Sequence, residues 1–176
     1  QVQETDGLKA GSVANLQATS RVPLNTKTLN IRIMKYPIKQ FTTHRLVKSE
    51  DLNHHGTLFA GRGAEWFVES GFVAASYLLP PKNIICVKIH GLTFQQPVKA
   101  GECVCYNSRI VHTGGSSLKA YVEVHKANCQ DLVVQGFITF VHVDENTKAT
   151  PHGIEMDAIT EEDKALMERA KQLKNK

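Results

Sequence analysis

Two carboxylates in an otherwise apolar stretch are the residues best suited to acid–base chemistry. Glu65 and Glu69 interrupt the run of residues 58–79, which contains only one other charged side chain, Arg62. On a helix, residues four apart share a face, so the two negative charges repel each other, and partial burial further disfavours the charged form. Both effects favour a carboxylate that accepts a proton near neutral pH, as a general base does. The structural alternative is that Arg62 pairs with Glu65, while Glu69 is exposed or pairs across a subunit interface.

A polar turn precedes this stretch and offers hydrogen-bond donors to an anion. Residues 51–61 read Asp-Leu-Asn-His-His-Gly-Thr-Leu-Phe-Ala-Gly. Capping chemistry at Asn53 predicts a helix that begins just after Gly56. The first amide groups of a helix have no partner within it, so Gly56 and the backbone after it are candidate donors to an oxyanion. The side-chain amide of Asn53 can itself cap the helix.

One buried helix and an antiparallel sheet are the elements that would position these groups. Small residues alternate with large apolar ones through residues 58–79, so the helix has little polar surface, and its glycines require close approach of a neighbouring element. Pro80-Pro81 ends this helix. Period-two patterns then predict four strands with short connections, at 84–98, 103–113, 118–129 and 132–143, forming a meander in sequence order.

The rest of the chain completes a single-domain plan. Short strand patterns at 31–36 and 42–47 precede the turn, and residues 160–174 predict an exposed, charged helix with a capping box at Thr160. We therefore expect an N-terminal arm at 1–30, one domain at 31–158 and a C-terminal helix at 159–176. Periodicity alone indicates the α+β class, with the long helix against one face of the sheet.

Composition restricts the classes of function. The 176 residues are 41% hydrophobic and 22% charged, with a net charge of +4 that is scattered rather than clustered. We therefore expect no nucleic-acid partner, no membrane span and no secretory signal. The cysteines, at positions 86, 103, 105 and 129, form no C-x-x-C pair, and we expect reduced thiols in a cytosolic protein and no zinc site. The adjacent His54 and His55 should point apart and lack ligands at metal spacing.

Four motifs in order resemble the hotdog-fold acyl-CoA thioesterases. They cover residues 42–151 and comprise Asn53-x-x-Gly56-Thr57-Leu58-Phe59-x-Gly61 with Trp66, Phe94-x-x-Pro97-Val98-x-x-Gly101-Glu102, Gly114-Gly115-Ser116-Ser117, and Phe140-Val141-x-Val143-Asp144-Glu145. The resemblance implies a hotdog fold, in which a curved antiparallel sheet wraps a long central helix. It further implies a homodimer with the two helices side by side, often assembled into a trimer of dimers.

The same resemblance implies hydrolysis of an acyl-CoA, with CoA as part of the substrate and no other cofactor. Asn53 matches the catalytic asparagine of the family, which implies that, instead of capping the helix, it positions the attacking water or the thioester carbonyl. The family's usual acid, however, lies two residues after Trp66, where this chain has Val68. Glu65 lies one turn before that position on nearly the same side of the helix, whereas Glu69 is its immediate neighbour, so we keep both as candidates and favour Glu65.

Two groups of residues would hold the substrate. The acyl chain is expected along the helix, beneath aromatic side chains such as Phe59, Trp66 and Phe94. Further substrate contacts are expected from His54, His55 and Gly61. The glycine-rich turn can be a simple hairpin between two strands. The resemblance instead implies that residues there contact the nucleotide and phosphates of CoA, namely Thr113, Ser116, Ser117 and Lys119. The family often has an arginine in this turn, and here a glycine replaces it.

Two rival functions remain open from the sequence. A hotdog dehydratase or hydratase pairs a histidine with a helical glutamate, and His55 and Glu69 have about that spacing. A non-catalytic module that binds acyl-CoA would account for Val68 at the usual acid position. Hydration of an enoyl thioester, and binding without turnover, would distinguish these rivals from a hydrolase.

Overall fold

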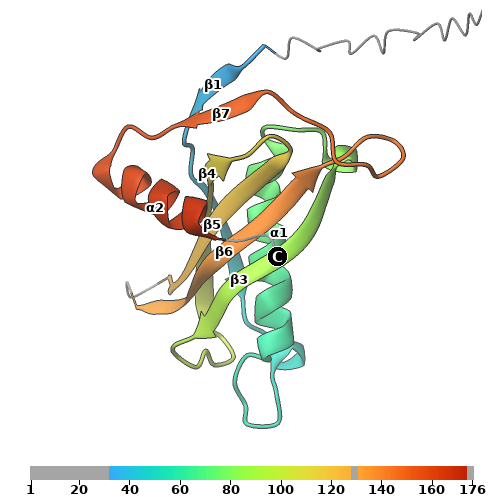
Figure 1. Ribbon diagram of the computed structural model, residues 1–176. Helices are drawn as coiled ribbons and strands as arrows, with labels where there is room; N and C mark the ends of the chain where they lie inside the picture. Colours follow the sequence, from blue (N-terminus) through green and yellow to red (C-terminus); the bar gives the residue numbers. More distant parts are fainter. Residues whose placement is uncertain (1–31, 128–130, 174–176) are drawn as a thin grey trace, which may run out of the picture. The chain divides into compact units, whose positions relative to one another are not determined.

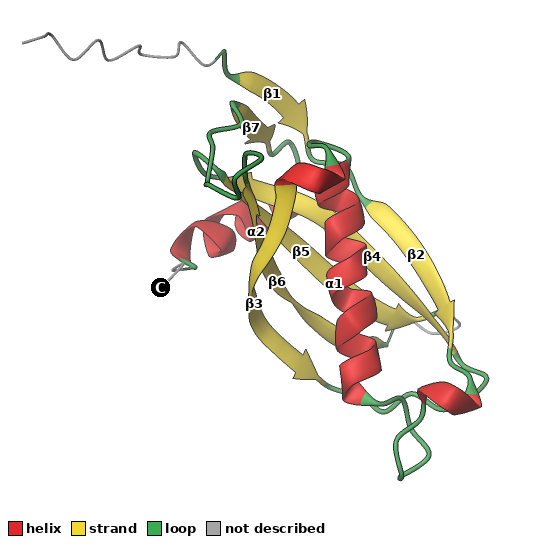
Figure 2. Cartoon of the chain, turned by 90° about the vertical axis from the view of Figure 1, so that its right-hand side faces the viewer, coloured by secondary structure: helices red, strands yellow, loops and turns green. Residues whose placement is uncertain are grey.

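The computed structural model describes residues 32–127 and 131–173 and places one helix against a five-stranded sheet. The elements are β1 (Met34–Pro37), β2 (Phe41–Leu46), α1 (Ala60–Ser76), β3 (Ile84–Phe94), β4 (Cys103–Thr113), β5 (Ser117–Lys126), β6 (Leu132–His142), β7 (Ile154–Asp157) and α2 (Glu161–Gln172), with short 3-10 turns at Ser49–Asp51 and Pro81–Asn83. Figure 1 shows their arrangement, and Figure 2 shows the sheet curving around α1. The expected N-terminal arm and Cys129 lie outside the described residues.

The order of strands differs from the expected meander. The sheet is antiparallel with the order β2-β4-β5-β6-β3, so β3 pairs with β6 and not with its successor β4. The connection between β3 and β4 contains Pro97 and runs past the start of α1, where Thr57 and Lys99 form an isolated β-bridge. That connection is therefore a crossover anchored beside the helix rather than a hairpin, and only β4, β5 and β6 form a meander.

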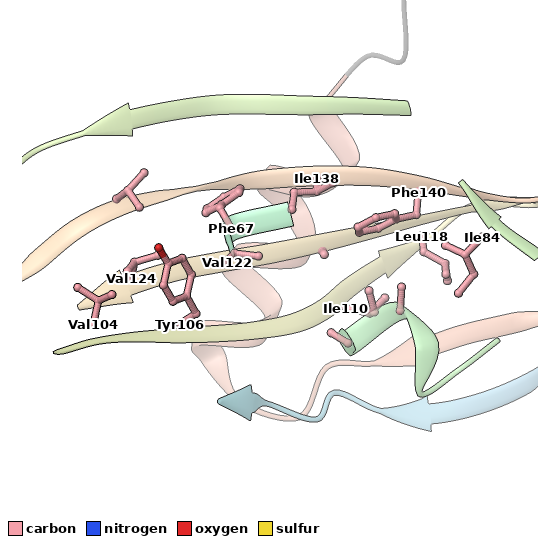
Figure 3. Close-up of a cluster of buried hydrophobic side chains, with 14 of the residues drawn as sticks. Phe67, Ile84, Val104, Tyr106, Ile110, Leu118, Val122, Val124, Ile138 and Phe140 are labelled. Atoms are coloured by element: carbon pink, nitrogen blue, oxygen red, sulfur yellow. The ribbon is translucent and has the colours of Figure 1, made fainter. Parts of the chain in front are cut away.

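α1 packs closely on the sheet, as its glycines predict. A Cβ added to Gly71 would lie 2.7 Å from Cδ1 of Ile138 and 3.4 Å from Cε2 of Phe140. Phe67 is fully buried between helix and sheet, among the apolar side chains of β4, β5 and β6 (Figure 3). Large side chains on the strands fill the space that the small helical residues leave, which fixes the position of α1 along the sheet.

α2 packs on the opposite face of the sheet. Thr160 caps it by accepting a hydrogen bond from the amide of Asp163, which confirms the predicted start. The helix is less exposed than expected, because Leu166 and Ala170 are buried against Val111, Tyr121 and Phe137. Strand residues alternate between faces, so the sheet has one apolar surface for α1 and a smaller one for α2.

Candidate active site

The turn before α1 is organised by the side chain of Asn53. Its Oδ1 accepts hydrogen bonds from the amides of His55 (2.9 Å) and Thr57 (3.3 Å), and its Nδ2 donates to Oγ1 of Thr57 at 3.1 Å. Gly56 has φ +74°, a left-handed conformation suited to glycine, and its amide donates to the carbonyl of Asn53. Asn53 therefore caps its own turn and not the helix, which corrects the capping expectation.

The helix begins three residues later than expected, and this moves its unpaired amides. Residues 57–59 are held extended, with the amide of Leu58 bonded to Val98 O and that of Phe59 bonded to Asp51 O. Phe59 is the N-cap and makes no side-chain cap. Within the described part of the chain, the amides of Ala60 and Gly61 have no hydrogen-bond acceptor. The amide of Gly56 is already used, so the available donors lie at Ala60 and Gly61.

Gly61 allows an aromatic ring to lie on the first turn of the helix. A Cβ at this position would lie 2.5 Å from Cε1 of Phe59, so any side chain here would displace the ring. Phe59 itself is 55% exposed. The structure thus places an accessible aromatic side chain directly beside the unpaired amides.

Both candidate carboxylates lie on α1 and are paired with arginines. Glu65 accepts from Arg62 at 2.7 Å, and Glu69 accepts from Arg45 of β2 at 2.5 Å. The side chains of Glu65 and Glu69 are 53% and 49% exposed. A single subunit therefore does not bury either carboxylate as we expected for a general base. Val68 is partly buried against the core and cannot act as an acid or base.

Asp51 anchors the first of these ion pairs. Its carboxylate, only 8% exposed, contacts Nε of Arg62 at 3.2 Å and accepts the amide of Lys48 at 3.0 Å. Arg62 thus links a fixed, buried carboxylate to Glu65. The pairing of Arg62 with Glu65 was among the expectations, but the role of Asp51 was not, because its partner is distant in sequence.

Arg45 is a residue that sequence reasoning missed. Besides its ion pair with Glu69, its guanidinium lies 5.8 Å from the ring centroid of Trp66. No local signal in the sequence predicts this contact, since 24 positions separate Arg45 from Glu69. Only the packing of β2 beside α1 brings the two residues together.

A pocket of about 290 Å³ adjoins the turn. It is lined by Asn53 and Thr57 from the turn, by Ala60 from the first turn of α1 and, across from them, by Phe94 and Pro97. Phe94 also contacts the helix, because a Cβ on Gly63 would lie 3.1 Å from its ring. The motifs around Asn53 and around Pro97 therefore form one pocket, with an unpaired amide at its edge.

The glycine-rich turn lies at the other end of α1. The carbonyl of Ser116 accepts the amide of His142, and the next residue, Val143, donates to the carbonyl of Asn83, just after the helix. α1 has 17 residues, so about 25 Å of helix separates this turn from Ala60. The two halves of the expected site are therefore far apart in one subunit, as Figure 2 shows for the two ends of α1.

Two of the expected nucleotide contacts are engaged elsewhere. Oγ1 of Thr113 donates to the carbonyl of Ile154 in β7. Lys119 is buried on the α2 side of the sheet, where its Nζ donates to the carbonyls of Ala170 (2.8 Å) and Leu173 (2.9 Å). Lys119 therefore caps α2 and is not available to phosphate, which corrects that expectation. Ser116 and Ser117 are partly exposed at the turn.

The histidines form no metal centre. His54 and His55 do not point apart as expected, because their rings lie 3.9 Å apart between centroids on the exposed turn. Across residues 32–127 and 131–173, no group of three or more His, Cys, Asp or Glu could hold a metal ion. In the same ranges, no helix has the length and apolar character needed to cross a membrane.

Comparison with known proteins supports the fold and the family resemblance. A model of the thioesterase superfamily matches residues 55–133, from the turn through β5. A hexameric acyl-CoA thioesterase of known structure superposes with a TM-score of 0.73 at 29% identity, covering 79% of this chain and 92% of the other. The chain has the hotdog fold, and 79 of its 176 residues match the thioesterase superfamily. Both the predicted fold and the predicted resemblance to this family are thereby confirmed.

Relatives of this hotdog protein are named as acyl-CoA thioester hydrolases. YkhA of Bacillus subtilis, described as an uncharacterized acyl-CoA thioester hydrolase, is 27% identical over 105 residues, which is 57% of this chain and 60% of YkhA. YciA of Escherichia coli K12 is 28% identical over 82 residues, 45% of this chain and 59% of YciA. The matches thus span about 60% of the length of these relatives.

A more distant structure supports the fold alone. The acyl-CoA hydrolase of Staphylococcus aureus, solved in complex with butyryl coenzyme A and coenzyme A, has a TM-score of 0.70 and 21% identity, over 78% of this chain and 84% of that one. Structures of the same hydrolase exist with single alanine replacements of an asparagine and of an aspartate, fifteen positions apart.

Proposed function

We propose that the chain is a hydrolase that cleaves the thioester of an acyl-CoA into a free acid and CoA. The observation that carries the proposal is the pair of unpaired amides at Ala60 and Gly61, beside a pocket lined by Asn53. Donors held in this way stabilise the oxyanion of an acyl-transfer intermediate, which forms when a nucleophile adds to the thioester carbonyl. The names of the relatives favour the same reaction.

A helical carboxylate supplies the base in this proposal. It removes a proton from water as the water oxygen attacks the carbonyl carbon, and the tetrahedral intermediate then expels the CoA thiolate, which takes up that proton. Direct attack by the carboxylate would instead form an anhydride that water then hydrolyses. The same residues serve both routes.

Glu65 is the first candidate for this carboxylate. Glu65 lies five residues after Ala60, which corresponds to about 7.5 Å along the helix axis. Glu69 lies nine residues after Ala60, which corresponds to about 13.5 Å. The asparagine and aspartate replaced in the S. aureus hydrolase are fifteen positions apart, and the residue at that distance from Asn53 is Val68. A glutamate one turn earlier would compensate for the missing acid through its longer side chain.

A second copy of the chain would complete the site. Pairing two copies with α1 helices antiparallel would bring the Asn53 turn of one beside the Ser116 turn of the other, so that acyl and nucleotide ends of one substrate are held by two chains. β3 is an edge strand whose exposed Ile85, Val87 and Ile89 suit such an interface. Hexameric neighbours favour further assembly as a trimer of dimers.

The proposal is tested by free-thiol release from acyl-CoA substrates, from acetyl-CoA to palmitoyl-CoA. We compare wild type with Glu65→Gln, Glu69→Gln and the control Glu168→Gln, which breaks a similar ion pair with Lys171 on α2. Loss of the base should lower kcat by about 10²- to 10⁴-fold in one α1 variant only. Turnover that is absent in wild type would refute the hydrolase, and enoyl-CoA hydration or tight binding of a thioether analogue would then identify a rival function.

A further inference from the structure

A second pocket, of about 650 Å³, lies on the face of the sheet that α2 covers. It opens between β3, β6 and the last turn of α2, and its polar lining comes from His90, Thr93, Gln95, Gln135, Arg169 and Gln172. Figure 1 shows α2 on this side of the sheet and α1 on the other. The pocket therefore differs from the one beside Asn53, although Gln95 lines both.

An irregularity in the sheet forms the floor of this pocket. The register of β3 and β6 shifts between His90 and Thr93, so two residues of β3 lie opposite Gly136 alone. Gly91 has φ +66°, and a Cβ on Gly136 would lie 2.8 Å from the carbonyl oxygen of His90. Both glycines are therefore required by the bulge, which is a common feature beside binding sites.

The polar groups in the pocket are biased toward hydrogen-bond donors. The Arg169 guanidinium lies over the rings of Phe137 (5.2 Å to the centroid) and Tyr121 (5.9 Å) and has no acidic partner among the described residues. The Gln135 carbonyl oxygen already accepts the hydroxyl of Tyr121 at 2.7 Å, so its amide NH₂ is left for a ligand. Among the residues that the structure describes, no aspartate or glutamate lines the pocket.

Two lysines lie close to the wall of the pocket. Burial lowers the pKa of His90, and the nearby charges of Lys88 and Lys119 lower it further, so both lysines act on the pocket wall. Nε2 of His90 is engaged with Oγ1 of Thr139 at 2.9 Å, which fixes the ring against the sheet. Hydrogen-bond donors and an arginine without an acidic partner among the described residues favour an anionic ligand.

We propose that this pocket binds a small molecule that carries an oxyanion, phosphate or carboxylate, through the guanidinium of Arg169. Guanidinium groups bind either oxyanion with two parallel hydrogen bonds, and stacking on aromatic rings holds the group in one orientation. The amides of Gln135 and Gln172 would contact the remainder of the ligand. Because Gln95 also lines the pocket beside Asn53, an occupied site would contact the wall of the catalytic pocket. The proposal does not depend on the thioesterase activity.

Calorimetric titration of the full chain with inorganic phosphate, AMP and butyrate tests this site. If phosphate and AMP bind but butyrate does not, the ligand carries a phosphate. If butyrate binds but phosphate and AMP do not, the ligand carries a carboxylate. Arg169→Gln should weaken binding by about tenfold or more, because the ion pair is lost. Lys164→Gln removes the same charge from the first turn of α2, where Lys164 pairs with Glu161, and should change the Kd by less than about twofold.

Two further variants locate the ligand and exclude a folding defect. Gln172→Glu keeps Arg169 in place but adds a negative charge to the pocket, so it should also weaken binding. Ser116→Glu alters the proposed CoA site and should leave binding of the probe unchanged. The inference is overturned if none of the three probes binds at millimolar concentration, or if the Kd is unchanged in Arg169→Gln, or if Ser116→Glu abolishes binding.

Discussion

At the scale of single residues, the turn before α1 separates a structural role from a chemical one. Asn53 accepts two backbone amides and also faces the pocket that contains Ala60. Its acceptor oxygen organises the turn, whereas its NH₂ group could hold a water or a carbonyl. In the proposed reaction, this side chain thus has a structural role in the turn, in place of the expected helix cap, and a chemical role toward the substrate.

Replacing Asn53 with aspartate tests this division of roles. An aspartate retains the two acceptor bonds, and the Thr57 hydroxyl can donate to it, so the free energy of unfolding should change by less than about 0.5 kcal/mol. The lost NH₂ group and the added charge should lower kcat/KM by about 10²-fold or more. Urea denaturation and thiol-release kinetics give the two values, and an unchanged kcat/KM would leave Asn53 with the structural role alone.

His152 makes stability depend on pH. Its Nδ1 accepts the amide of Ile154 at 3.0 Å, and its Nε2 lies 3.2 Å from the carbonyl of Ser117. Burial lowers the pKa of His152, the bond to Ser117 opposes this, and His142 lowers it further. Protonation would place a hydrogen on the nitrogen that accepts from Ile154, so it would release the start of β7.

The sign of the effect follows from proton linkage. Below about pH 6.5 the unfolded chain takes up a proton at this position before the folded chain does, so stability falls as the pH decreases. We expect the free energy of unfolding to decrease from pH 7 to pH 5, and this dependence to be weaker in His152→Asn, whose Oδ1 can still accept from Ile154. An identical pH dependence in the variant would contradict the assignment.

At the scale of elements, glycines set how closely neighbouring elements approach. In α1 the neighbour of Gly71 is the flexible end of Ile138, but at Gly136 the neighbours are the backbone oxygens of His90 and Gly91. A side chain can rotate away, whereas a bulged strand cannot move without loss of its ladder bonds. The β3–β6 bulge should therefore be the less tolerant site.

Gly136→Ala should lower the free energy of unfolding by about 1–3 kcal/mol, the range found for overpacked sites. Gly115→Ala is the matched control, because nothing lies within 4 Å of a Cβ there and its backbone is not left-handed. The free energy of unfolding of this control variant should lie within about 0.5 kcal/mol of the wild-type value. Chemical denaturation of both variants gives the comparison, and equal stabilities would show that β3 can shift.

At the scale of the whole molecule, the proposed dimer would build each site from opposite ends of α1 in two chains. In a two-fold dimer, a defect at the Asn53 end of one chain and a defect at the Ser116 end of the other fall in the same site. The second site of that mixed dimer then contains neither defect. Mixing inactive variants therefore distinguishes a shared site from a site within one chain.

Glu65→Gln mixed with Ser116→Glu should recover activity, up to about a quarter of wild type, since half of randomly mixed dimers have one intact site of two. The control mixes Glu65→Gln with Asn53→Ala, whose defects lie at the same end, so that every shared site contains one defect. Thiol release after denaturation and refolding of the mixtures measures the recovery. Equal activity in the two mixtures would contradict the shared site.

Features that depend on neighbours in the chain were determined by the sequence alone. The glycine-rich buried helix, the cap at Thr160 and most of the strand segments follow from local backbone preference and from burial periodicity, and the motifs sufficed for the hotdog fold. The helix ends at Ser76, four residues before Pro80, and the strand β7 was not predicted. The ion pair of Arg62 with Glu65 also follows from helical spacing. These features need no knowledge of which strand lies beside which.

Tertiary structure decided every feature that joins distant segments. The pairing of β3 with β6, the capping of α2 by Lys119 and the ion pair of Arg45 with Glu69 depend on sheet order and on which face a strand presents. The alternation of strand residues indicates two faces but not which elements cover them. The free amides moved from Gly56 to Ala60 and Gly61 for the same reason, because bridges to distant residues hold 57–59 extended and delay the helix.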